Sequence, residues 1–172
     1  PFDSLKRLSQ LQELDQQLEL IHDNLNPDFQ YTDQSSFANR QVNHSYQLFA
    51  VHALYHLCVC TLHSSIVPVF SNIPPDPRIS KKLTRLSAEE AIKHSSNLCT
   101  MATEFLGIIP DKSRCPSFSA YAMFVAVSIQ FKSLGAQGLL RGDSIGRLYP
   151  AISILERVKR IWRPLEGLVS YH

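Results

Sequence analysis

Apolar residues recur at helical spacing along most of the chain and predict five helices. The first spans residues 3–25, where one stripe alternates steps of three and four: Leu11, Leu14, Leu18, Ile21 and Leu25. Ser4 is its expected cap. Asn26-Pro27 is its expected end, because a residue that precedes proline is disfavoured in the α region.

The second predicted helix, residues 37–67, is the longest and the most apolar. It ends at Pro68, and its centre is apolar nearly all round, which is typical of a helix buried on every side. We therefore expect this helix at the middle of the fold. Leu54 lies in its centre and is expected to be a core residue.

Three further helices are predicted downstream. Ser87 to Glu90 has the pattern of a capping box and opens a helix that ends near Gly107. Two more are expected at about 117–134 and 143–162, and no segment alternates as a strand would. The prediction is an all-α fold, with about five antiparallel helices around one long buried central helix, and residues 1–172 forming a single domain.

The composition adds constraints on the class of protein. Hydrophobic residues make up 44% of the 172 residues and charged residues 19%, which is typical of a globular domain. The net charge of +2 is too small to indicate nucleic-acid binding by this chain. The four cysteines match neither a zinc-finger spacing nor a disulfide framework, so free thiols are expected. The absence of a starting Met suggests that the chain is part of a longer protein.

Histidines are the chemical feature that stands out. His52, His56 and His63 lie within about 40° of one another on the helical wheel, so they share one face of the central helix. His52 and His56 could supply two ligands to a metal, but His63 is about 10 Å further along the axis. No acidic residue accompanies them in this helix, so hydrogen-bonded histidines in a helical core are the favoured interpretation, and no metal site is expected.

Other catalytic patterns are weak. GxSxG does not occur, and the glycine-rich residues 135–146 fit neither common phosphate-loop pattern. We therefore expect no catalytic residues and no enzymatic activity. A membrane span is not expected either, because the same three histidines interrupt the most apolar run, residues 45–70.

The sequence LFAVHALYHLCVCTLHSSIV, residues 48–67, resembles a signature of the fungal zinc-cluster transcription factors. Their middle homology region contains a helix of the type L-H-x-L-Y-H-x-x-x-I-x-L-H-R-P, and the matching residues here are His52, Leu54, Tyr55, His56, Leu62 and His63. Ser64-Ser65 stands where that family has Arg-Pro. Residues 18–31, 89–105 and 116–134 resemble neighbouring elements of the same region, in the same order.

The resemblance implies a regulatory module of a nuclear, sequence-specific transcription regulator. It implies that DNA is contacted only through a six-cysteine zinc cluster outside this chain, so no cofactor is expected in the chain itself. A small-molecule effector, a coactivator or a second copy are the partners it suggests. His52, Tyr55, His56 and His63 are the candidate effector-pocket or polar-core residues, because a helical core with polar groups can line a pocket.

Two alternatives remain open. The leucine stripe of residues 5–25 suits a coiled-coil seam, so the chain could be a helical interaction scaffold without a ligand. A core-facing helix explains the same stripe. The other alternative, a small enzyme with a metal on His52 and His56, is the one we expect to be wrong.

Overall fold

All regular structure in the computed structural model is helical within the described residues, which are 2–31, 37, 41–108, 117–138, 146, 148–149, 152–153 and 155–156. The elements are α1 (Phe2–Asp23), the 3-10 turn η1 (Pro27–Phe29), α2 (Val42–Ser64), α3 (Pro68–Ser71), α4 (Lys81–Ile108) and α5 (Ser117–Ala136). The all-α prediction is confirmed. The expected helix at 143–162 lies mostly outside the described residues, and the four-residue α3 was not predicted.

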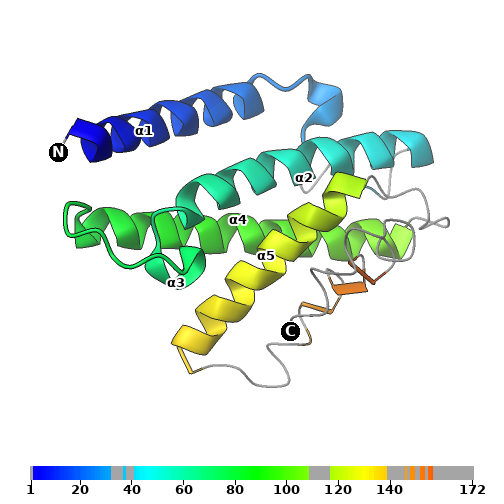
Figure 1. Ribbon diagram of the computed structural model, residues 1–172. Helices are drawn as coiled ribbons and strands as arrows, with labels where there is room; N and C mark the ends of the chain where they lie inside the picture. The colour runs from blue at the N-terminus through cyan, green and yellow to red at the C-terminus, as the bar shows by residue number, and fades with distance from the viewer. Residues whose placement is uncertain are drawn as a thin grey trace.

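The helices run up and down, with α2 at the centre. In Figure 1, α1, α2 and α4 lie antiparallel in succession, and α5 crosses α2 and α4 obliquely. α2 contacts each of the other four helices, and the 28-residue α4 packs extensively against α2 and α5. α1 packs on α2 and forms one edge of the bundle.

The core lies where α2, α4 and α5 meet. Phe49 of α2 stacks on Phe105 of α4 with ring centroids 4.2 Å apart, and Phe37 packs edge-on against both. α5 contributes fully buried alanines, Ala120, Ala122 and Ala126, and small side chains let helix axes approach closely at a crossing. Leu148 and Leu155, from the C-terminal part of the chain, are also buried in this cluster.

Several predicted helix ends are wrong. α2 begins at Val42, not near residue 37, and ends at Ser64. Pro68 then opens α3, where a missing amide hydrogen costs nothing at the first helical position. α5 ends close to the expected glycines, since Gly138 follows it in the left-handed region at φ 66°.

The capping box expected at Ser87 is also wrong. α4 begins six residues earlier, and the hydroxyl of Ser80 accepts a hydrogen bond from the backbone N–H of Leu83 at 3.2 Å. Ser80 is therefore the N-cap of α4. Ser87 lies inside the helix and is buried against α2, where its hydroxyl meets a histidine.

The inward face of α1 differs from the predicted stripe. Leu11 and Leu18 are partly buried, but Leu14 and Ile21 are exposed. The positions that turn inward between the leucines carry Asp15 and His22. The helix therefore presents polar side chains to α2, at places where a purely structural seam would hold leucine.

Three further expectations concern Leu54, the cysteines and a membrane span. Leu54 is 51% exposed, so its assignment to the core is wrong, and α2 has one open side. Cys58, Cys60 and Cys99 are free thiols, as expected, and Cys115 lies outside the described residues. Within the part of the chain that the structure describes, no helix combines the length and apolar character that crossing a membrane requires.

Candidate functional site: a histidine-lined pocket

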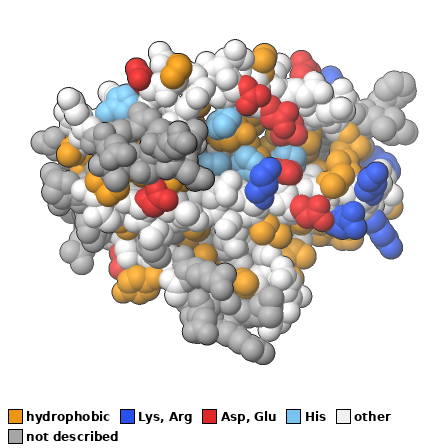
Figure 2. Space-filling model, turned by 180° about the vertical axis from the view of Figure 1, so that it is seen from behind, with side chains coloured by type: hydrophobic (Ala, Val, Ile, Leu, Met, Phe, Trp, Pro, Cys, Tyr) orange, Lys and Arg blue, Asp and Glu red, His pale blue; other side chains and the backbone are white. Residues whose placement is uncertain are grey.

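A cavity of about 640 Å³ opens between α1, α2 and α4. Figure 2 shows histidine side chains in a hollow of this face, with acidic side chains beside them. Of the seven histidines in the chain, five line the cavity: His22, His52, His56, His63 and His94. The volume lies within the range of small-molecule sites.

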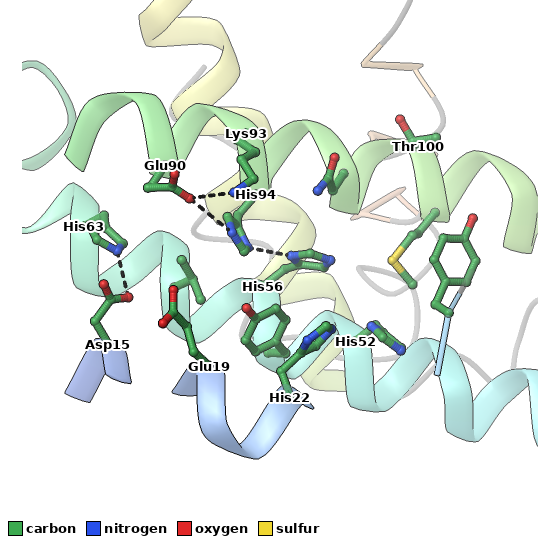
Figure 3. Close-up of a pocket in the computed structure, with 15 residues that line it drawn as sticks. Asp15, Glu19, His22, His52, His56, His63, Glu90, Lys93, His94 and Thr100 are labelled. Atoms are coloured by element: carbon green, nitrogen blue, oxygen red, sulfur yellow. Dashed lines mark hydrogen bonds and ion pairs between the residues drawn. The ribbon is translucent and has the colours of Figure 1, made fainter. Parts of the chain in front are cut away.

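The four candidate residues from the sequence, His52, Tyr55, His56 and His63, all line this cavity. They lie along one face of α2 because their spacing returns to the same side of the helix. Figure 3 shows that α1 and α4 bring further side chains to the same space. Effector binding at these four residues stays a prediction.

His56 and His94 form a buried pair across α2 and α4. Their Nδ1 atoms are 2.9 Å apart, so one ring donates its Nδ1–H and the other accepts. The Glu90 carboxylate lies 3.5 Å from Nε2 of His94, and a carboxylate only accepts. This favours the proton of His94 on Nε2, which makes His56 the donor and leaves its own Nε2 as an acceptor.

Both rings of this pair are neutral near pH 7. Burial, together with the neighbouring His94, lowers the pKa of His56 from its ordinary 6.5 to about 3. Burial and the charge of Lys93 also lower the pKa of His94, although Glu90 acts in the opposite direction. Among the described residues, Nε2 of His56 has no hydrogen-bond partner, and His56 is 6% exposed.

His63 connects three helices through a chain of serine, histidine and aspartate. Its Nε2 donates to Oδ1 of Asp15 at 3.0 Å, and its Nδ1 lies 3.3 Å from the hydroxyl of Ser87. The residue types are those of a hydrolytic triad. However, Ser87 is 1% exposed and does not line the cavity, and it sits within α4, whose interior backbone amides are already hydrogen-bonded. We therefore interpret these hydrogen bonds between Ser87, His63 and Asp15 as a structural connection between α1, α2 and α4.

Two aromatic contacts shape the wall between α1 and α2. The rings of His22 and Tyr55 stack with centroids 4.2 Å apart, and His52 meets His22 edge-on. Nε2 of His52 lies 2.8 Å from the carbonyl oxygen of Phe29 and donates to it. Burial and the nearby acidic side chains, Glu19 first among them, raise the pKa of Tyr55, so its phenol stays protonated.

Three carboxylates line the cavity, and they differ in their partners. Asp15 is paired with His63, and Glu90 is paired with Lys93 at 3.0 Å and with His94. Glu19 makes no hydrogen bond or ion pair with any described residue. It is exposed and lies on the inner side of α1, so it offers an unpaired negative charge at the edge of the cavity.

The sequence did not identify His22, His94 or the three carboxylates as pocket residues, and Glu90 drew notice only as part of the expected capping box. Each lies on a helix that was predicted mainly from its apolar residues. Only the packing of the helices brings these polar side chains to the face of His56. One signal was available, because Asp15 and His22 stand seven residues apart at inward positions of α1.

Within the described ranges, no three His, Cys, Asp or Glu side chains are placed so that they could hold a metal ion. The pocket instead holds two neutral imidazoles, an unpaired carboxylate and stacked rings. Such an arrangement can bind a small polar ligand. The thiols of Cys60 and Cys99 are outside it, and burial raises the pKa of each to about 12.

The comparisons with known proteins give no family assignment: no protein-family model matches the chain, and no curated protein or solved structure matches it.

Proposed function

We propose that this chain is a regulatory helical module of a transcription regulator of the fungal zinc-cluster type, with the histidine-lined cavity as its effector pocket. The observation that carries the proposal is the convergence of His52, Tyr55, His56 and His63 on one cavity. These residues match the family signature by sequence position. Because they line one cavity, the signature residues could together bind a small-molecule effector.

The proposal assigns specific DNA contact, and the zinc it requires, to a segment outside this chain. It places the protein in the nucleus and gives the chain no catalytic step. An effector between α1, α2 and α4 would strengthen the packing of α1, whose main contact with the rest of the fold is with α2. A change in α1 packing is then the signal that the module passes on, to a coactivator or to the rest of the regulator.

The first test is the native transcript upstream of the codon for Pro1. A six-cysteine zinc cluster followed by a basic linker supports the proposal, and an unrelated upstream domain contradicts it. The second test fuses the chain to a heterologous DNA-binding domain and measures a reporter gene in a fungal host. We expect His56→Gln to change reporter output at equal protein level, while Glu13→Gln, on the exposed side of α1, leaves it unchanged.

The scaffold alternative has an observation of its own. Leu14 and Ile21 stand seven residues apart on one side of α1 and are 49% and 63% exposed, and this side could pair with α1 of a second copy. Sedimentation velocity over a hundredfold range of concentration tests it. A dimer that Ile21→Glu dissociates favours the scaffold, and a monomer throughout removes it.

A further inference from the structure

We propose that the ligand of this cavity is a small organic cation, a primary amine on a compact aromatic or apolar body. This inference rests on the proposed effector pocket and specifies its chemistry. It is carried by two groups that have no partner among the described residues, the carboxylate of Glu19 and Nε2 of His56.

The first group sets the charge of the ligand. Asp15 and Glu90 are already satisfied by His63 and Lys93, whereas Glu19 is not. A carboxylate accepts hydrogen bonds and attracts positive charge, and an ammonium supplies both a charge and three donors. The carboxylate of Glu19 would repel an anionic ligand and would stay unpaired beside it, so we expect the pocket to exclude anions.

The second group sets the polarity of the ligand deeper in the cavity. Since His56 donates its Nδ1–H to His94, its Nε2 carries a lone pair. His56 is 6% exposed, and its Nε2 is not fully shielded from the cavity, so a ligand donor such as a hydroxyl can take the place of water on this acceptor. The buried pair is held neutral by its surroundings, so this acceptor persists at neutral pH.

The walls set the shape of the body. Tyr55 and His22 present stacked rings, and Val59 and Met101 contribute buried apolar surface that is 3% and 2% exposed. An aromatic face also attracts a cation placed over it. A flat or compact apolar body with one ammonium and one further donor satisfies all of these groups together.

A matched series of probes tests the charge directly. Tyramine, tyrosol and 4-hydroxyphenylacetate share a phenol and differ at the other end in carrying an ammonium, a neutral hydroxyl or a carboxylate. Each is titrated into the 172-residue chain by calorimetry at pH 7.5 and low salt, with EDTA present. We expect tyramine to bind at least about tenfold more tightly than the other two, which is the worth of one charge-assisted hydrogen bond.

Two variants test the assigned residues. Glu19→Gln keeps the shape and removes the charge, and it should weaken tyramine at least about tenfold while leaving tyrosol unchanged. Glu13→Gln, an exposed carboxylate of the same helix that does not line the cavity, is the control and should change neither. Both positions are exposed, so both variants are expected to fold.

The other outcomes overturn the inference in distinguishable ways. Equal binding of tyramine and tyrosol, or tighter binding of 4-hydroxyphenylacetate, removes the amine and keeps the effector pocket. Binding of Zn²⁺ in a titration without EDTA, lost in His56→Ala, with no binding of tyramine, replaces the amine by a metal. No binding by any probe, together with a reporter that still responds to His56→Gln, rejects the amine alone. No binding and an unresponsive reporter reject the proposed function as well.

Discussion

Two regions built from the same pair of helices, α2 and α4, follow opposite rules. At one, Phe49 and Phe105 stack inside a cluster of apolar residues that α5 closes with alanines. At the other, His56 and His94 face α1 across a cavity that carboxylates line. The apolar cluster gains stability from area removed from water, and the polar pocket must pair each buried group or leave it unsatisfied.

The comparison shows that the apolar cluster contributes most of the stability and that the polar pocket lowers it. Leucine at the inward positions of α1 held by Asp15 and His22 would have extended the apolar packing. The polar residues at these positions weaken the packing of α1, and they line the cavity between α1, α2 and α4. α1 contributes no fully buried residue among those whose side chains are described, which makes it the helix most easily displaced.

Phe105→Ala should have the largest effect on stability. The side chain is 1% exposed and meets Phe37, Tyr46 and Phe49, so its removal leaves a cavity in the apolar cluster. We expect a loss of about 3 to 5 kcal/mol in the free energy of unfolding, measured by urea denaturation. Phe131→Ala, at a residue of α5 that is 49% exposed, is the control and should cost much less. Equal losses would mean that the cluster is not the centre of stability.

Acidification should act on the polar region. The folded-state pKa of His56, about 3, lies below the 6.5 of the unfolded chain, so the unfolded chain binds the proton first. Stability is therefore complete above pH 6.5 and falls as the pH drops toward 3. For His56 alone the loss between pH 7.5 and pH 5 is about 2 kcal/mol.

Denaturant titrations at several pH values measure this loss, and His56→Gln is the variant that isolates it. The pH dependence of this variant should be shallower by about the stated amount. Other ionisable and charged side chains face the ring, and both chains share them: His22, Glu19, His52, Glu90, Lys93 and His94. Identical slopes for the two proteins would show that the ring is not buried as the structure places it.

The sequence anticipated four of the described helices, α1, α2, α4 and α5, and one wall of the pocket, and the reasons are local. Helical periodicity places His52, His56 and His63 on one side of α2 without knowledge of any neighbour. His22 and His94 come from other helices, so their position depends on packing, which a single sequence does not encode in its spacing. Tyr55 was found through the family resemblance.

Two misassignments have specific causes. Ser87 to Glu90 has a capping pattern, but Ser80 offers an earlier cap, and α4 extends to it because residues such as Leu83 and Ser87 pack inward. Leu54 was assigned to the core because its helix is apolar on most sides. A helix can be apolar all round and still leave one side uncovered, since hydropathy does not state how many neighbours surround it.

Asp15→Asn should loosen the contact between α1 and the rest of the pocket. The hydrogen bond from His63 to the charged carboxylate is replaced by one to a neutral amide, and Asp15 is partly screened by solvent. We expect a loss of about 1 kcal/mol. Hydrogen exchange measured by NMR should show faster exchange for α1 amides and unchanged rates in α5. Glu13→Gln should change neither, and a uniform increase over all helices would contradict a local role.

Leu54→Ala should have the smallest effect, and it tests whether α2 has a third, open side beside the apolar cluster and the pocket. Because Leu54 is 51% exposed, its truncation removes little buried area, and we expect a loss of about 0.5 to 1 kcal/mol. Leu48→Ala is the matched control, since Leu48 is fully buried six residues earlier in the same helix and should lose several times more. If both leucines cost the same, α2 is covered on all sides, and the contrast between its closed and open faces fails.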